Sequence, residues 1–335
     1  MPSTLPGVPD IDEDLANRIV ERLGAIEHRL RDSVSSSDDM MRWTGRHLMD
    51  AGGKRVRPML VLLAASFGDV DAEGVQDVAV LVELTHLASL YHDDVMDSAP
   101  TRRGTDSAHA LWGNNVAILT GDFLFSRASG LSARIGTEAV RLHSETFERL
   151  CLGQLHETVG PKVGDDPFEH YISVLSDKTA SLLALAGGLG ASLSGAPEGT
   201  ADVMRRYGEK VGVAFQLADD VLDLESDAAT SGKTPGIDLR EGVPTMPTLL
   251  IRRRAAEQPD THTLDILERL DGDLSSESSL EELVALLRAD PALEETRQLA
   301  TRTADEAIGI LAELPAGGVR DALIGFTSTL VRRNR

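Results

Sequence analysis

Cysteine is almost absent from this chain of 335 residues. Cys151 is the only one, so no disulfide can form within the chain. Long apolar runs are missing as well: no stretch of eighteen apolar residues would cross a membrane, and no charged-then-apolar leader opens the sequence. We therefore expect a cytoplasmic protein without an integral membrane segment.

Positive charge is also scarce. The 54 acidic residues exceed the 33 basic ones and give a formal net charge of -21. This balance argues against nucleic acid as a partner, because phosphate backbones bind to an excess of positive charge. An anionic substrate would need local basic clusters. Lysine is rarer than arginine, so the positions of the few lysines are informative.

No linker rich in Pro, Gly or Ser divides the chain, and 41% of its residues are hydrophobic. We predict one domain over residues 1–335, with residues 1–9 disordered. Apolar residues recur at helical spacing, and no stretch alternates like a strand. Several predicted helices exceed twenty residues, which favours an all-α bundle of long, mostly antiparallel helices around a deep central cavity. The predicted helices cover residues 10–33, 38–51, 56–68, 75–97, 107–133, 136–159, 167–194, 200–226 and 244–256, with shorter helices over 257–335.

Two acidic pentads end long apolar stretches: DDVMD, from Asp93 to Asp97, and DDVLD, from Asp219 to Asp223. In a helix, the first and fifth aspartates of each pentad lie one turn apart on one face. If two such helices faced each other, their carboxylates would repel one another, and hard cations would relieve the repulsion. Because magnesium prefers one or two carboxylates together with substrate phosphates, the pentads predict a site for magnesium and diphosphate.

Acidic clusters in such an acidic chain also arise as solvated helix faces. Asp165, Asp166 and Glu169 have a similar spacing, but they lie beside Pro167 and two glycines, which is typical of a loop that caps a helix. The pentads differ because each follows more than two turns of mostly apolar sequence. Charges attached to a buried helix are costly unless something pairs them.

The segment GGKRVRP, residues 52–58, combines glycines with basic side chains and a helix start. Glycines let a backbone approach an anion, and the start of a helix adds unpaired N–H groups, so Lys54 and Arg57 are candidate anion ligands. An ordinary turn between helices is the alternative. Arg102 and Arg103 follow the first pentad, and guanidiniums match phosphate oxygens with parallel hydrogen bonds.

Polar residues also accompany both pentads. Lys178 and Thr179 open an apolar helix, and Lys233 follows the second pentad in a loop with glycines; both lysines are placed to meet a metal-bound diphosphate. His86 lies two turns before the first pentad, and Gln216 lies one turn before the second. A satisfied core histidine and a surface glutamine are the alternatives for these two.

These motifs together resemble a known family. GGKRVRP, ELTHLASLYHDDVMD with RRG, SDKTA, GVAFQLADDVLD, GKTPGIDLREG and PTMP have the order and spacing of the all-trans isoprenyl diphosphate synthases, from about residue 20 to residue 250. The EGVPT string resembles actinobacterial members, although Val243 replaces a lysine that is common in relatives. The resemblance implies the isoprenoid synthase fold, a homodimer, three magnesium ions per active site, and head-to-tail condensation of an allylic diphosphate with isopentenyl diphosphate.

The resemblance also implies a role for each motif residue. Metal ligands are Asp93, Asp97 and Asp219, with Asp94, Asp220 and Asp223 supporting them directly or through water. The isopentenyl diphosphate site consists of Lys54, Arg57, His86 and Arg103. The residues that hold the allylic diphosphate are Arg102, Lys178 and Lys233, with Thr179 and Gln216 near the developing cation.

Product length depends on the helix that carries the first pentad. Ser89 and Ala88 lie about one turn before Asp93 and are small, and Thr85 lies another turn away, so a growing hydrocarbon tail finds room there. We predict a product of thirty carbons or more, such as a menaquinone side-chain precursor, with geranylgeranyl diphosphate as the alternative.

Two other classes of protein share some of these features. A class I terpene cyclase also has an aspartate-rich helix, but its second metal motif usually follows an Asn/Ser/Glu pattern, whereas this chain has DDVLD. A non-catalytic subunit of a heteromeric synthase would be expected to lack one pentad. Because this chain carries both, the prenyltransferase is favoured.

Overall fold

The computed structural model describes residues 11–35, 37–226 and 235–331. Contacts within the chain divide it into two compact units. The first unit comprises Met1–Glu148, Ser181–Glu209 and Ile308–Phe326, and the second comprises Arg149–Ala180, Lys210–Ala307 and Thr327–Arg335. A single domain over residues 1–335 stays a prediction, and the expected disorder of residues 1–9 lies outside the described residues.

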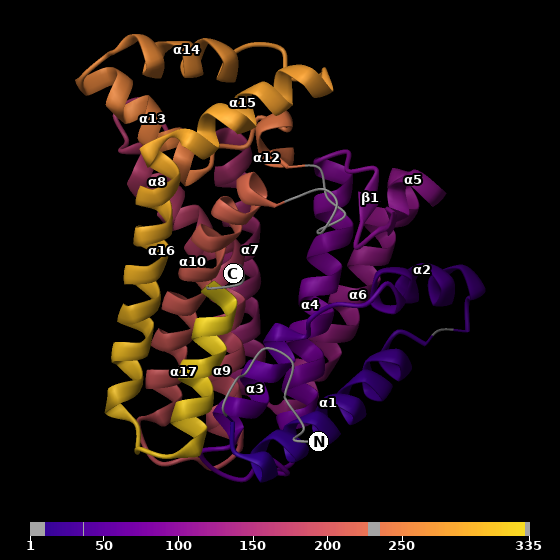
Figure 1. The fold of residues 1–335 in the computed structure, drawn as a ribbon. Coiled ribbons are helices and arrows are strands. Elements are labelled where there is room, and N and C mark those ends of the chain that lie inside the picture. The colour runs from indigo at the N-terminus through magenta and orange to yellow at the C-terminus, as the bar shows by residue number, and fades with distance from the viewer. Residues whose placement is uncertain (1–10, 36, 227–234, 332–335) are drawn as a thin grey trace. The chain divides into compact units, whose positions relative to one another are not determined.

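Helices make up most of the described structure (Figure 1), which confirms the all-α prediction. The first unit contains α1 (Glu13–Ser33), α2 (Asp39–Asp50), α3 (Val56–Ala65), α4 (Val75–Met96), β1 (Thr101–Arg102), β2 (Thr105–Asp106), α5 (Ala108–Trp112), α6 (Asn114–Ile135), α9 (Ser181–Leu193) and the 3-10 helix η2 (Leu311–Glu313). The second contains α8 (Pro167–Leu175), the π-helix η1 (Ser176–Ala180), α12 (Ile237–Arg240), α13 (Met246–Glu257), α14 (Thr261–Leu270) and α15 (Glu277–Ala289). Residues of both units belong to α7 (Thr137–Val159), α10 (Thr200–Glu225), α16 (Pro291–Ile310) and α17 (Gly318–Val331).

Helix α4 organises the first unit, where it packs against α3, α6 and α9. Its apolar side chains are buried along most of its length, as expected of a helix that is covered on several sides. Helix α6 approaches it closely because Gly121 has no side chain: a Cβ atom there would lie 2.3 Å from Nε2 of His92. The helix that carries the first pentad is therefore held by its neighbours.

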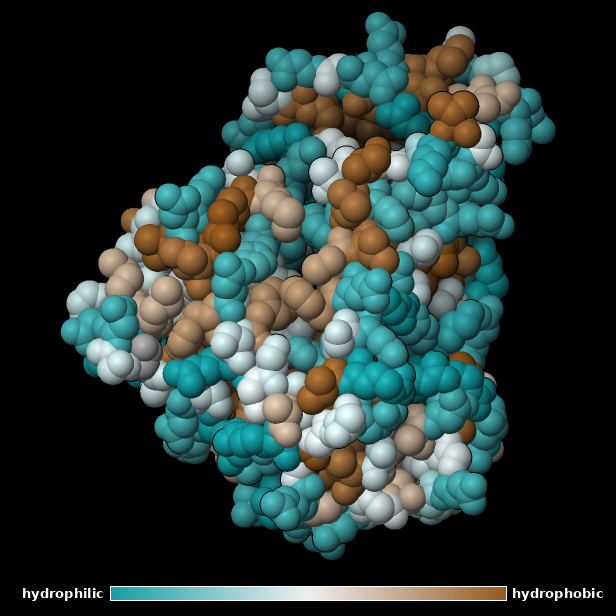
Figure 2. Space-filling view, turned by 180° about the vertical axis from the view of Figure 1, so that it is seen from behind, coloured by the Kyte–Doolittle hydropathy of each residue, from teal (hydrophilic) through white to brown (hydrophobic). Residues whose placement is uncertain are grey.

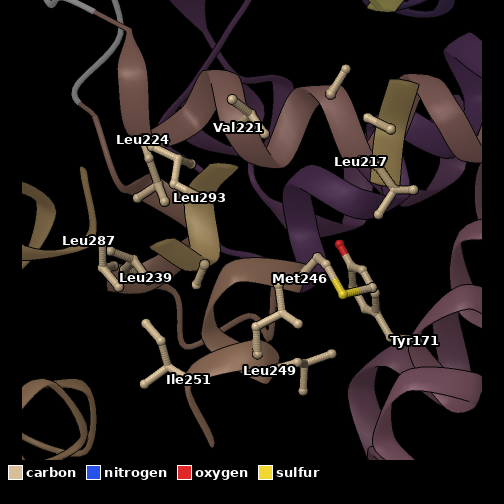
Figure 3. Packing of buried hydrophobic residues seen from close by; sticks show 14 of the residues in the cluster. Tyr171, Leu217, Val221, Leu224, Leu239, Met246, Leu249, Ile251, Leu287 and Leu293 are labelled. Carbon is tan, nitrogen blue, oxygen red and sulfur yellow. The ribbon is translucent and has the colours of Figure 1, made fainter. Parts of the chain in front are cut away.

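The second unit has its own hydrophobic core (Figure 3), built from α8, α10, α13, α15 and α16. Leu217 and Val221 of α10 lie in this core, on the same helix as the second pentad, together with Met246 at the start of α13. Tyr171 of α8 also lies in the core, and its hydroxyl needs a polar partner there.

Three sequence predictions need correction. The helix predicted over 107–133 is two helices, because Gly113 adopts a φ of 84° between α5 and α6. The helix predicted over 167–194 is interrupted by η1. A strand pair exists where none was predicted: β1 and β2 form a hairpin with Thr101 opposite Asp106. Its two strands are too short to give an alternating pattern.

The acidic cluster of Asp165, Asp166 and Glu169 lies at the start of a helix and caps it, as predicted. Asp166 is the N-cap of α8, and its carboxylate accepts a hydrogen bond of 2.7 Å from the backbone N–H of Phe168. Pro167 follows as the first helical residue, where its missing N–H costs nothing. This acidic cluster therefore has a structural explanation that does not involve a ligand.

One helix among the described residues, Pro167–Leu193, is long and apolar enough to cross a membrane by length and composition. Inside the structure, 67% of its apolar window is buried, which makes it weak evidence for a membrane span. Apolar side chains also reach the surface: brown residues lie among teal ones on the face drawn in Figure 2. Exposed examples in the first unit are Ile118 and Leu119 of α6.

Candidate active site

The first pentad lies at the carboxyl end of α4. Asp97 is the C-cap, and its backbone N–H donates to the carbonyl oxygen of Asp93 over 2.8 Å. These two aspartates therefore lie one turn apart, as predicted. Asp93 is partly exposed and Asp97 exposed, whereas Asp94 is fully buried. Two of the three carboxylates remain accessible to a ligand.

Asp94 is held by the hairpin that follows the pentad. Its Oδ1 accepts a hydrogen bond of 2.6 Å from Nε of Arg102, on β1, and its buried Oδ2 has no hydrogen-bond partner among the described residues. Burial raises the pKa of Asp94, and the charge of Arg102 opposes that rise. Arg103 and Gly104 form the turn with φ values of 55° and 76°, the two positive values that a type I′ hairpin requires. Arg102 therefore lies beside the pentad that precedes it in the sequence.

Arg103 lies against the glycine loop, residues 52–55. Its Nη1 donates to the carbonyl oxygen of Leu48 over 2.8 Å and also to that of Gly52. Gly53 makes room for it, because a Cβ atom there would lie 3.1 Å from Nη1 of Arg103 and 2.9 Å from Nη1 of Arg55. The structure thus places Arg103 beside GGKRVRP, with one of its terminal nitrogens engaged by the backbone.

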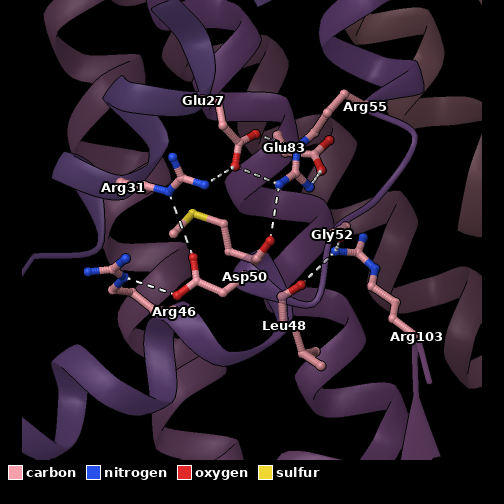
Figure 4. A network of polar contacts seen from close by, with 10 residues as sticks. Glu27, Arg31, Arg46, Leu48, Asp50, Gly52, Arg55, Glu83 and Arg103 are labelled. Carbon is pink, nitrogen blue, oxygen red and sulfur yellow. Dashed lines mark hydrogen bonds and ion pairs between the residues drawn. The ribbon is translucent and has the colours of Figure 1, made fainter. Parts of the chain in front are cut away.

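Arg55 is the most fully engaged basic residue of the loop (Figure 4). Nε and Nη2 donate to the two carboxylate oxygens of Glu27 over 2.8 and 3.0 Å, and Nη1 donates to Oε1 of Glu83 over 2.9 Å. Nη2 also reaches the carbonyl oxygen of Met49 over 3.2 Å. Arg55 adopts a φ of 49° as the residue before α3. Its side chain thus anchors a strained turn.

Arg57 and His86 lie in the same positively charged region. Burial lowers the pKa of Arg57 to about 10, Glu83 opposes the change, and Arg103 adds to it. Burial and then the charges of Arg57 and Arg103 hold the pKa of His86 well below its usual range, so His86 is neutral. Lys54 is exposed at the loop. These residues, predicted from separate motifs, come together in the first unit.

The second pentad lies within the last turns of α10. Asp219 and Asp223 are partly exposed, whereas Asp220 is buried. One oxygen of Asp220 accepts two hydrogen bonds, 2.7 Å from the hydroxyl of Tyr171 and 2.9 Å from the backbone N–H of Met246. Burial raises the pKa of Asp220 to about 8, although both donors oppose the rise. In the metal-free chain this carboxyl group is therefore mostly protonated at neutral pH.

Lys178 and Thr179 lie in the π-helical segment η1, a geometry that is frequent at functional sites. Nζ of Lys178 donates to the carboxylate of Glu157 on α7. Helix α7 approaches η1 closely because Gly153 has no side chain: a Cβ atom there would lie 2.6 Å from the backbone nitrogen of Lys178. Thr179 is buried, with 8% of its surface exposed.

Gln216 and Lys233 are the remaining predicted residues of this region. Gln216 is partly buried on α10, three residues before Asp219. Lys233 lies outside the described residues.

The predicted chain-length residues lie on α4. Ala88 and Thr85 are fully buried, and Ser89 is partly buried. The hydroxyl of Thr85 donates to the carbonyl oxygen of Leu81 and lies 3.0 Å from Nε2 of His143, whose pKa is lowered by burial. Ala88 and Ser89 lie about one turn before Asp93, and the buried pair of Thr85 and His143 lies one turn further along the helix.

The donor set suits a hard divalent cation. Both pentads present partly exposed carboxylates, those of Asp93 and Asp97 in the first and of Asp219 and Asp223 in the second. No group of three or more His, Cys, Asp or Glu side chains forms a metal site among the described residues. Magnesium that is bound through one or two carboxylates and substrate phosphates needs no such group.

Sequence reasoning missed three partners of the predicted residues. Glu83 and Glu157 hold basic residues, and Tyr171 holds an aspartate. Glu83 had a usable signal, because it is an isolated charge within the apolar stretch before His86, where an unpaired carboxylate is costly. Tyr171 and Glu157 had none, since neither is an isolated charge within an apolar stretch.

Comparisons with known proteins point to one family. A family model described as "Polyprenyl synthetase" matches residues 38–287. A nonaprenyl diphosphate synthase from Mycobacterium tuberculosis is 40% identical over 335 residues, covering 99% of each chain. A dimethylallyltranstransferase from the same organism is 36% identical, covering 95% of this chain and 96% of that one. A crystal structure of geranylgeranyl pyrophosphate synthase from Corynebacterium glutamicum, complexed with calcium and isoprenyl diphosphate, is 40% identical, covers 96% of this chain and 98% of that one, and has a TM-score of 0.84.

The helical fold and these matches define a transferase of prenyl groups. The chain belongs to the polyprenyl synthetase family. Enzymes of this family use a divalent metal ion and take isopentenyl diphosphate and an allylic diphosphate as substrates.

Proposed function

We propose that this protein condenses an allylic diphosphate with isopentenyl diphosphate, head to tail, and extends an all-trans product to thirty carbons or more. The supply of basic groups carries the proposal. Arg57 and Arg103 gather around the glycine loop in the first unit, while Arg102 and Lys178 each accompany a carboxylate elsewhere. Basic side chains beyond those at the glycine loop suit a second diphosphate, which a condensation requires and a hydrolysis does not.

Ionisation of the allylic carbon–oxygen bond leaves a carbocation and a diphosphate anion. Arg102 and Lys178 are assigned to the allylic diphosphate, whose growing negative charge they would stabilise. Bound magnesium, three ions per active site in this proposal, would neutralise the same leaving group. Asp93, Asp97 and Asp219 are assigned as its ligands, with Asp223 beside them.

Around the cation, polar groups are few. Thr179 is buried and Gln216 is partly buried, and these side chains are assigned to positions near the developing positive charge. The apolar surface of the helices would keep water away from it.

Isopentenyl diphosphate must be held with its double bond against the cation. Lys54, Arg57, His86 and Arg103 are assigned to its diphosphate, and fixing that group orients the rest of the molecule. Neutral His86 donates a hydrogen bond without adding charge. The final proton is lost to the departing diphosphate, so no protein base is assigned.

Product length is assigned to α4. Because Ala88 and Ser89 have small side chains, a growing tail would find room beside them in this proposal. Relatives that are 40% identical are named for a nonaprenyl and for a geranylgeranyl product, so sequence identity alone does not choose the product length. We expect Ser89→Phe to shorten the product, with Ser144→Phe on the exposed side of α7 as the control. Mass spectrometry of the products is the measurement. Unchanged lengths in Ser89→Phe would remove the role of α4, and a twenty-carbon wild-type product would favour geranylgeranyl diphosphate synthase.

A homodimer is part of the proposal. Ile118 and Leu119 of α6 are 40% and 54% exposed, and a second copy of the chain would cover such adjacent apolar side chains. Analytical ultracentrifugation should give a dimer for the wild type and a monomer for Leu119→Glu. A monomeric wild type would contradict this part.

The test of the function is incorporation of labelled isopentenyl diphosphate in the presence of magnesium and allylic primers of several lengths. Long prenyl diphosphates are expected. No incorporation with any primer would favour a non-catalytic subunit, and a cyclic hydrocarbon without incorporation would favour a terpene cyclase. Separating soluble and membrane fractions of the cell would test the cytoplasmic location, and the products could then be compared with menaquinone side-chain precursors.

A further inference from the structure

Glu83 is a buried carboxylate that none of the roles above uses. It lies in the middle of α4, one turn before His86, with only 2% of its surface exposed. Among the described apolar residues around it, such a charge persists only when it is paired. Its Oε1 accepts a hydrogen bond of 2.9 Å from Nη1 of Arg55. The pair links the helix that carries the first pentad to the glycine loop.

Arg55 uses most of its hydrogen-bonding capacity on the protein. A guanidinium has five N–H donors, and four hydrogen bonds from Arg55 reach Glu27, Glu83 and Met49. Little capacity is left for a phosphate. Although Arg55 stands between Lys54 and Arg57 in the basic motif, its side chain points into a clamp of two carboxylates (Figure 4). The side chain of Arg55 therefore holds the glycine loop in place.

The neighbouring guanidiniums are placed differently. Arg57 is enclosed, and its buried Nε has no hydrogen-bond partner among the described residues. Arg103 crosses the loop and binds the carbonyl oxygens of Leu48 and Gly52. The charge of Glu83 acts on all three arginines, since it raises the pKa of Arg55, Arg57 and Arg103 against the effect of burial. One buried carboxylate thus offsets a cluster of like charges.

We propose that Glu83 is a positioning residue for the isopentenyl diphosphate site. Through Arg55 it fixes the glycine loop, and its charge keeps Arg57 and Arg103 close together before the diphosphate arrives. This inference rests on the proposed function. The gain is preorganisation: donors that already stand in place lose little freedom when the anion binds. The competing effect is direct repulsion between Glu83 and the anion, which would make Glu83 unfavourable for binding.

The two effects predict opposite results for Glu83→Gln, which keeps the size of the side chain and removes its charge. If positioning dominates, KM for isopentenyl diphosphate rises at least about tenfold while kcat and KM for the allylic primer change less than about threefold. If repulsion dominates, KM for isopentenyl diphosphate falls. Glu138→Gln is the matched control, because Glu138 also pairs with an arginine, Arg141, but lies exposed on α7. An unchanged or lower KM in Glu83→Gln would overturn the proposal.

A double-mutant cycle with Arg55→Lys tests the route of the effect. Lysine keeps the charge but cannot grip two carboxylates, so Arg55→Lys should raise the same KM. If Glu83 acts through Arg55, the KM of the double variant for isopentenyl diphosphate should exceed that of the more affected single variant by less than about threefold. Additive effects on KM would overturn the route through Arg55. Should Glu83→Gln fail to fold, Arg55→Lys with a normal KM for isopentenyl diphosphate would itself overturn the proposal.

Binding of inorganic diphosphate gives a readout besides activity. Calorimetric titration without metal should give a Kd at least about tenfold weaker for Glu83→Gln than for the wild type and Glu138→Gln. Equal or tighter binding by Glu83→Gln would contradict the role of Glu83. If the wild type is inactive with every primer, the proposed function fails, while this titration still decides whether Glu83 prepares an anion site.

Discussion

The two aspartate pentads have nearly the same sequence but different surroundings. In both, the second aspartate is buried while the first and fifth keep exposed surface. Asp94 is paired with a guanidinium, that of Arg102. Asp220 instead accepts from the neutral hydroxyl of Tyr171 and from the backbone N–H of Met246. The same motif therefore meets a cation in one unit and neutral dipoles in the other.

This difference changes how strongly the effect of burial is opposed at each buried carboxyl group. Neutral donors only partly offset burial at Asp220, and its pKa rises to about 8. Burial also raises the pKa of Asp94, but there the full charge of Arg102 opposes it. Asp220 thus stores a proton in the metal-free protein, and binding of a cation nearby would release it. A repeated motif need not have repeated electrostatics.

The largest expected effect would show what the pentads share. Asp93→Asn and Asp219→Asn should each lower kcat about a thousandfold, because a metal-stabilised leaving group is worth several kcal/mol and each factor of ten is about 1.4 kcal/mol. Chelating the divalent metal should abolish turnover. Glu169→Gln, in the acidic cluster at the start of α8, is the control and should keep wild-type activity. If kcat fell in only one of the two variants, the two pentads would not contribute equally to catalysis.

The next effect concerns Asp220→Asn and would sharpen the contrast. A folded pKa of about 8 lies above the unfolded value near 3.8, so the wild type loses stability as pH rises from about 4 to about 8, on the order of 1 kcal/mol per pH unit. Asparagine does not ionise and can accept both hydrogen bonds on one oxygen. The metal-free variant should therefore be more stable than the wild type at pH 8, by thermal unfolding with a chelator present. A lower Tm at pH 8 would rule out the protonated Asp220.

Asp94→Asn should have a smaller effect, because the charge of Arg102 opposes the rise that burial causes in the pKa of Asp94. The amide nitrogen would replace the buried Oδ2, which has no hydrogen-bond partner among the described residues. The free energy of unfolding, measured by urea titration at pH 8 with a chelator present, should change less than in Asp220→Asn. Equal effects of Asp94→Asn and Asp220→Asn would mean that the two surroundings are equivalent after all.

The smallest expected effect is a pH dependence of stability that a buried histidine of the first unit causes. Burial lowers the pKa of His143, next to Thr85 on the helix of the first pentad, so the unfolded chain takes up a proton first as pH falls below about 6.5. The wild type should then lose up to about 1 kcal/mol per pH unit on the acid side through this group. His143→Gln should flatten that part of the pH profile, whereas replacing the exposed His28 by Gln should not. An unchanged acid slope in His143→Gln would contradict a neutral buried imidazole.

Much of the fold follows from the sequence because helices are local structures. The spacing of apolar residues predicts α4 and α10 to within a residue or so of their ends. The predictions failed where a local break competed with that spacing, as at Gly113 and in η1. The hairpin of β1 and β2 escaped prediction because two-residue strands leave no periodic pattern.

Within the site, the sequence by itself determined which residues carry charge and where along each helix they lie. It placed Asp93 and Asp97, and Asp219 and Asp223, one turn apart, since that spacing is a property of the helix alone. Only the tertiary structure decided which charged side chains are paired with other groups of the protein. Arg55 pairs with Glu27 and Glu83, and Asp220 accepts a hydrogen bond from the neutral hydroxyl of Tyr171. These partners lie far apart in the chain, so they meet only through packing.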